Sequence, residues 1–162
     1  VKYGFIKNLL PAYTSLYLDD GRRVVAQFYK DVRDGKVDEF MNTLSDLLEK
    51  IPYSATSKED VQWREQNYQI AVALIFQFMG MYTQTEVYSA KGRADCVVYT
   101  EHIIYIFEFK LWSSGSPEDA LAQIEEKGYA VPYQSSGKKL IAVGASFDEV
   151  KRNIGAWKAK EL

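Results

Sequence analysis

Cysteine and histidine are almost absent from this chain of 162 residues, which holds Cys96 and His102 as its only examples. One cysteine cannot form an internal disulfide or a cysteine-rich zinc site, so nothing requires an oxidising compartment, and we expect a cytoplasmic protein. One histidine excludes HExxH metalloproteases and multi-histidine zinc or iron centres. A bound metal would therefore need carboxylate ligands, which favour Mg²⁺, Mn²⁺ or Ca²⁺.

Long apolar runs and an excess of positive charge are also missing. The longest apolar run, residues 70–76, is far shorter than the roughly 20 residues of a membrane helix, and no signal-peptide pattern opens the chain. We therefore expect a soluble protein with no membrane partner. A formal net charge of −2 and a pI near 5.5 exclude a uniformly basic nucleic-acid-binding surface. Any site for a polyanion must be local.

Hydrophobic residues make up 47% of the chain, enough for a single core in one compact domain. The chain begins at Val1 without a methionine, and its first residues lead directly into structured-looking sequence. We therefore expect a fragment of a longer polypeptide.

Helices are predicted in the first half of the chain. Apolar residues recur at helical spacing through 37–51. A helix over 21–33 is expected before it, ending near Gly35, and a third is expected from Ser57 to about residue 79.

The pattern then changes to that of strands, rich in β-branched and aromatic residues. A three-strand meander is predicted over 83–90, 94–100 and 103–110, with Lys91 to Arg93 as the first turn. Ser116 and Pro117 have the residue types that begin a helix. That helix should end near Gly128, followed by a buried strand over 139–147 and room for one more around 154–157. The order predicts a mixed α/β domain.

Two carboxylates meet in the predicted second hairpin. If it closes symmetrically about Glu101 and His102, Asp95 lies opposite Glu108, with Cβ atoms about 5 Å apart. Like charges at that distance destabilise a sheet unless a cation neutralises them. Lys110 lies two residues beyond Glu108 and so on the same face. The pattern predicts a divalent-metal site, and the alternative is an ordinary ion pair between Glu108 and Lys110 on a solvated face.

A third acid occupies a position where an apolar residue is expected. The apolar stripe of the third predicted helix includes Val61, Tyr68 and Val72, and Glu65 completes it. Glu65 either points into the same cleft or pairs with a nearby basic side chain, and both interpretations stay open.

One pattern consists of Gly92 to Asp95, twelve intervening residues, and then Glu108-Phe109-Lys110. It resembles the D-x(n)-E-x-K core of the PD-(D/E)XK nuclease superfamily. Ala94 stands where the proline of that name would be. Residues 120–133 resemble the A-L-x-Q-I-x-x-K-x-Y-A-x-x-Y segment of a prokaryotic branch whose nuclease-like domain follows an AAA-ATPase-like domain. The resemblance extends over roughly residues 60–157.

The resemblance implies a restriction-endonuclease-like αβββαβ core, with a central mixed sheet flanked by helices. Residues 57–162 would be the nuclease-like domain, and residues 1–56 an N-terminal helical connector packed on or leading into that core. The implied activity is hydrolysis of phosphodiester bonds in nucleic acid, with DNA the expected substrate and Mg²⁺ or Mn²⁺ the cofactor. An AAA-ATPase-like domain would precede the chain in the same polypeptide.

The resemblance also assigns roles residue by residue. The implied metal ligands are Asp95, Glu108 and the Phe109 carbonyl. Lys110 would orient or activate the attacking water, Glu65 would be the helix acid, and Gln123 would steady the site. Substrate contacts are expected from Arg93, Tyr129 and Tyr133.

Two functions stay open at this stage. One is a metal-dependent nuclease, favoured by the presence of Asp95, Glu108 and Lys110 together. The other is a nuclease-like module that binds nucleic acid or a protein partner without cutting, because fold similarity does not establish activity. The acidic pI is compatible with this second, non-cutting function. A candidate basic patch lies near the end of the chain: Lys138, Lys139, Lys151, Arg152, Lys158 and Lys160.

Overall fold

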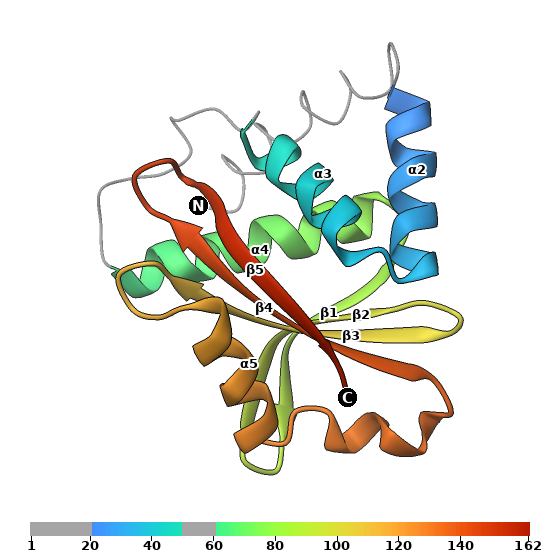
Figure 1. The fold of residues 1–162 in the computed structure, drawn as a ribbon, viewed down its shortest axis with the longest axis vertical. Helices are drawn as coiled ribbons and strands as arrows, with labels where there is room; N and C mark the ends of the chain where they lie inside the picture. Colours follow the sequence, from blue (N-terminus) through green and yellow to red (C-terminus); the bar gives the residue numbers. More distant parts are fainter. Residues whose placement is uncertain (1–20, 50–60) are drawn as a thin grey trace.

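A mixed five-stranded sheet lies between two layers of helices in the computed structural model, which describes residues 21–49 and 61–162 (Figure 1). The strands are adjacent in chain order: β1 (Tyr82–Ser89), β2 (Gly92–Tyr99), β3 (Ile103–Leu111), β4 (Lys139–Asp148) and β5 (Asn153–Glu161). Strands β3 and β4 are parallel, and the other neighbouring pairs are antiparallel. The expected α/β class with a central mixed sheet is confirmed.

Three helices cover one face of the sheet: α2 (Gly21–Asp34), α3 (Val37–Glu49) and α4 (Val61–Phe78). Phe40 of α3 is fully buried, with its ring centroid 6.0 Å from that of Phe76 in α4 and 5.3 Å from that of Tyr105 in β3. Helices α2 and α3 thus share the main core with the sheet. The proposed boundary at residue 56 lies outside the described residues, and the division into connector and domain stays a prediction.

Helix α5 (Pro117–Glu126) and the 3₁₀ helix η2 (Val131–Ser136) follow on the opposite face. Helix α5 begins where the sequence predicts, because Ser116 closes a capping box with Asp119. The Asp119 amide donates to the Ser116 hydroxyl, and the Asp119 carboxylate accepts the Ser116 amide at 2.8 Å. The amide and the hydroxyl of Ser116 both donate to this carboxylate, and these two bonds hold the pKa of Asp119 below its usual range.

A glycine in β4 lets α5 lie unusually close to the sheet. A Cβ added to Gly144 would lie 2.2 Å from the Pro117 carbonyl oxygen, a contact that the backbone cannot relieve without moving. Gly144 is the register partner of Glu108 in β3. The close approach therefore brings α5 to the level of the predicted site.

The second hairpin has the predicted symmetric register, which runs from Cys96 opposite Phe107 to Tyr99 opposite Ile104. The first hairpin turns one position earlier than expected, because Gly92 and Arg93 already pair with β1. Strand β5 is longer than the expected 154–157.

The expected start of the third helix, after Ser57, lies outside the described residues. In the part of the chain that is described, no helix is long and apolar enough to cross a bilayer.

Candidate active site

Asp95 lies where β2 and β3 separate. Their pairing stops at Cys96 and Phe107, after which β2 continues along β1 and β3 continues along β4. Oδ2 of Asp95 accepts a hydrogen bond of 2.8 Å from the Phe109 amide. A backbone amide that loses its strand partner needs another acceptor, and the Asp95 carboxylate supplies it. The side chain of Asp95 is thereby held against β3.

Glu108 is only 3% exposed although it is a carboxylate. Its Oε1 accepts a hydrogen bond of 3.2 Å from Nζ of Lys110, whose side chain is 19% exposed. Nε2 of Gln123, in α5, donates to the same oxygen. Nζ of Lys110 also donates to Oε1 of Gln123 at 2.5 Å. A buried charge is tolerated when it is paired and hydrogen-bonded, and this closed triangle meets both conditions for Glu108.

Tyr129 lies behind Gln123, with its hydroxyl 3.2 Å from the Gln123 amide nitrogen. Its ring packs on Gly92, where an added Cβ would lie 3.0 Å from the hydroxyl. Tyr129 is 4% exposed. Stacking on a nucleotide needs an exposed ring, so the buried Tyr129 ring does not offer that kind of contact, and a substrate contact by Tyr129 stays a prediction. Its hydroxyl supports Gln123.

The other two expected substrate contacts bond to residues outside this cluster. Arg93 forms an exposed ion pair of 3.2 Å with Glu86 of β1. The hydroxyl of Tyr133 is 3.1 Å from that of Tyr99, which lies four residues along β2 from Asp95, or about 13 Å away. Their roles stay predictions.

Glu65 belongs to the first turns of α4, but its side chain lies outside the described part, so its placement near the site also stays a prediction. The structure therefore brings together five of the predicted site residues: Asp95, Glu108, Phe109, Lys110 and Gln123.

The expected basic patch is largely neutralised. Four of its lysines pair with carboxylates: Lys158 with Glu118 at 2.5 Å, Lys160 with Glu125 at 2.5 Å, Lys139 with Glu161 at 2.7 Å, and Lys151 with Asp148 at 4.0 Å. Nζ of Lys138 donates to the Thr100 carbonyl at 2.6 Å. The ion pairs join β5 to α5 and to β4, and they offset the positive charge of the paired lysines.

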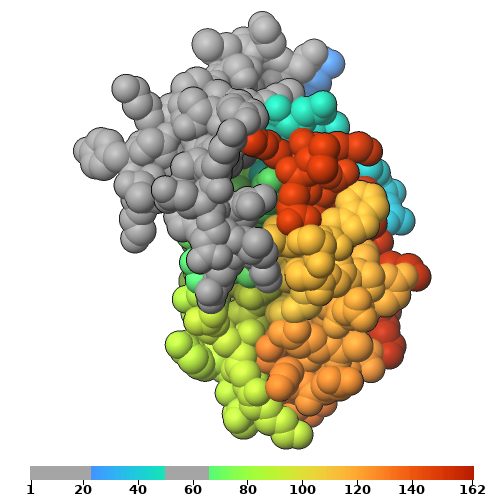
Figure 2. Space-filling view, turned by 90° about the vertical axis from the view of Figure 1, so that its left-hand side faces the viewer, coloured from blue at the N-terminus to red at the C-terminus, as the bar shows by residue number. Residues whose placement is uncertain are grey.

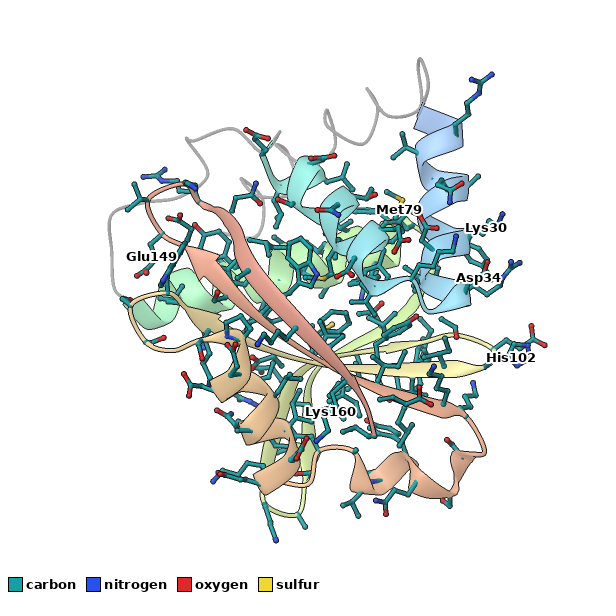
Figure 3. All side chains as sticks on the ribbon, viewed as in Figure 1. Lys30, Asp34, Met79, His102, Glu149 and Lys160 are labelled. Carbon is teal, nitrogen blue, oxygen red and sulfur yellow. The ribbon has the colours of Figure 1, made fainter. Side chains whose placement is uncertain are left out.

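The oxygen donors at the site fit a hard divalent cation. No group of three or more His, Cys, Asp or Glu side chains that could hold a metal occurs in residues 21–49 and 61–162, as far as their side chains are described. Mg²⁺ is usually held by only one or two carboxylates, with water and substrate phosphate completing its coordination, so Asp95 and Glu108 suffice. His102 is not a candidate ligand, because it lies at the opposite end of the sheet from Glu149 and the β4–β5 turn (Figure 3).

A comparison with family models agrees with this geometry. The model of the PD-(D/E)XK nuclease superfamily matches residues 63–157. The chain belongs to the PD-(D/E)XK nuclease superfamily. The match confirms the resemblance seen in the motif, and members of this superfamily are generally nucleases that use divalent metals.

One similar curated protein is an uncharacterized protein in the vnfD 5′ region of Azotobacter chroococcum mcd 1, which is 29% identical over 87 residues. These residues are 54% of this chain and 17% of that protein, so the chain spans about a sixth of its relative's length. No solved structure matches the chain.

Sequence reasoning missed Gly144 and the true position of Tyr129. A glycine inside an otherwise buried strand often marks a close backbone approach, and that signal was available at Gly144. The burial of Tyr129 depends on its packing against Gly92, which is distant in sequence, and no local pattern indicates it.

Proposed function

We propose that this nuclease-like domain is a metal-dependent nuclease that hydrolyses phosphodiester bonds, with DNA as its substrate. One observation carries the proposal. Asp95, Glu108 and Lys110 converge on one region where β2 and β3 separate, and Gln123 of α5 binds two of them. An ion pair on a solvated face would not bury the carboxylate to 3% or involve a second element.

Asp95, Glu108 and the Phe109 carbonyl would hold Mg²⁺ or Mn²⁺. When bound, the ion would polarise the phosphate and lower the pKa of water. Lys110 would bring its ammonium to the negative charge that builds up on the phosphate as the water attacks. Gln123 restrains that ammonium, because its Oε1 accepts from Nζ while its Nε2 holds Glu108. Glu65 stays the proposed helix acid.

We also propose that an AAA-ATPase-like domain precedes this one in the same polypeptide, and that the protein acts in the cytoplasm. The match to a relative of which this chain spans 17% supports a longer parent chain.

The test is cleavage of labelled single- and double-stranded DNA and RNA in Mg²⁺, in Mn²⁺ and in chelator. We expect cutting that chelator abolishes. Lys110→Ala should cut at least a hundredfold more slowly, the usual effect of removing one transition-state donor. Lys30→Ala, which removes an exposed lysine of α2, is the matched control and should cut normally.

Lys110→Ala leaves the buried Glu108 charge without its ammonium, so folding of the variant is checked by circular dichroism at the assay temperature. Lys110→Arg is the second variant, because it keeps the charge but changes its position. Equal cutting by Lys110→Ala and wild type would disprove the role of Lys110. A wild type that binds nucleic acid and cuts none of it would instead favour the non-cutting module.

A further inference from the structure

Trp112 is a large aromatic residue that stays 59% exposed at the end of β3. Its amide donates to the Phe147 carbonyl at 2.9 Å, which extends the parallel pairing of β3 and β4 by one residue. Alternation along the strand therefore places Trp112 on the same sheet face as Glu108 and Lys110. Residues two apart on a strand are separated by about 7 Å, so Trp112 is the next side chain on that face after Lys110.

The indole ring packs against the backbone of β5 at Gly155. A Cβ added to Gly155 would lie 3.0 Å from Cζ3 and 3.1 Å from Cε3 of Trp112, so a larger residue there would displace the ring. Gly155 lies at an irregularity in the pairing of β4 with β5. The ring thus rests on the β5 backbone and still keeps most of its surface open.

The loop that carries Trp112 is fastened to the β4–β5 turn. The amide of Ser113 donates to Oε2 of Glu149 at 3.0 Å, and its hydroxyl donates to Oε1 at 2.7 Å. Figure 2 shows this loop, in gold, beside the β4–β5 turn, in red-orange, on the face turned toward the viewer. The packing on Gly155 and the hydrogen bonds of Ser113 restrain the Trp112 ring before any ligand binds. The ring therefore loses little conformational freedom when a flat ligand binds it.

Charge contributes little to binding in this region. The formal net charge is −2, and Lys139, Lys158 and Lys160 are held in ion pairs. Lys151 in the β4–β5 turn has the loosest of these pairs, since its side chain is 78% exposed and its Nζ lies 4.0 Å from Asp148. A protein that follows a duplex through its phosphates needs several free cations, so affinity here has to come from another source.

We propose that Trp112 stacks on an unpaired nucleobase beside the scissile phosphate. This inference rests on the proposed nuclease function, and it defines the substrate class as single-stranded nucleic acid or a frayed end. Bases inside an intact duplex hide both of their faces in the stack, so only an unpaired or terminal base can lie on the ring. Lys151 would contact a neighbouring phosphate.

Binding is measured in chelator, where no cutting is expected, by fluorescence anisotropy of a labelled single strand and of a dumbbell duplex closed at both ends by linkers that carry no bases. Trp112→Ala should weaken single-strand binding about five- to a hundredfold, the equivalent of one stacked base, and leave dumbbell binding unchanged. Trp112→Phe should keep most of the affinity. Tyr29→Ala, which removes an exposed aromatic on α2, is the control and should have no effect.

A second readout does not depend on the Ala variant being folded. Oligothymidylate should quench the tryptophan fluorescence of wild type but not of Trp112→Phe, which keeps the other two of the three tryptophans. Unchanged single-strand binding by Trp112→Ala, or a wild type that binds no single strand, would overturn the inference. If the protein cuts nucleic acid but its single-strand binding does not depend on Trp112, only this inference is contradicted. A protein that binds single strands through Trp112 and cuts none would contradict only the nuclease function.

Discussion

Gln123 uses every hydrogen-bonding group of its side chain inside the site. Its Oε1 accepts from Lys110, and its Nε2 contacts both Glu108 and the Tyr129 hydroxyl. Only an amide offers an acceptor and two donor hydrogens at adjacent atoms, so a glutamate here could not donate to Glu108 and would add a second negative charge. The residue type follows from its three neighbours.

Asp119 is the residue whose ionisation is most clearly tied to a structural element. Its carboxylate is stabilised by the amide and hydroxyl of Ser116, so its pKa is lower in the folded chain than its ordinary value of 3.8. A group with a lowered folded pKa stabilises the fold above its unfolded pKa and loses that contribution as the pH falls through the folded value. Asp119→Ala should therefore lower the melting temperature at pH 7.

The difference between wild type and Asp119→Ala should shrink as the pH falls below 3.8, where the wild-type carboxyl takes up its proton. Thermal melts of both proteins from pH 7 to pH 2 measure it. Glu126→Ala, at the opposite end of α5, is the control and should show no such convergence. A constant difference across the whole range would contradict the assigned cause.

At the scale of elements, the position of α5 decides whether Gln123 reaches the sheet. Gly144→Ala should displace the helix, because the new Cβ would lie 2.2 Å from the Pro117 carbonyl oxygen and 3.0 Å from the Leu121 amide nitrogen. We expect a loss of about 1–3 kcal/mol in unfolding free energy, typical of overpacking, and at least a tenfold loss of cutting. Denaturant unfolding and the cleavage assay measure the two effects.

Gly137→Ala is the matched control for Gly144→Ala. Gly137 has a φ of 71° and no atom within 4 Å of an added Cβ, so alanine strains the turn without moving α5. This variant should lose stability and cut normally. If Gly144→Ala also cuts normally, close packing of α5 is not needed to position Gln123.

The elements also show what the sequence could predict. The register of β2 with β3 follows from a short turn and two alternating strands, so it was predictable from the chain alone. Strand β5 was underestimated because few of its residues are apolar. Its outer half is fastened by Lys158 and Lys160 to acids of α5, and such partners are distant in sequence. The burial of Tyr129 against Gly92 has the same non-local origin.

At the scale of the whole molecule, α2 and α3 are fastened to the central strand of the sheet. The hydroxyl of Tyr105 donates to the Val32 carbonyl at the end of α2, and burial raises the pKa of Tyr105 well above its usual range. Phe40 joins α3 to β3 through Tyr105 and Phe107, with centroids 5.3 Å and 6.4 Å away. We infer that the helical prefix unfolds together with the sheet.

Phe40→Ala tests this inference. Removing a fully buried phenylalanine should cost about 3–5 kcal/mol, and the lower melting temperature should appear in one cooperative transition. Tyr29→Ala, on the exposed side of α2, should change the unfolding free energy by less than about 0.5 kcal/mol. Two separate transitions, or an unchanged melting temperature, would show that the prefix is an independent connector.

The single thiol of the chain lies beside the candidate metal ligand. Cys96 is fully buried next to Asp95, and burial, with the nearby charge of Asp95, raises the pKa of its thiol far above the usual range. A thiol in that state reacts with an alkylating reagent only after β2 opens. The rate of alkylation of Cys96 therefore reports how often the sheet opens beside the candidate active site, and no label has to be engineered to measure it.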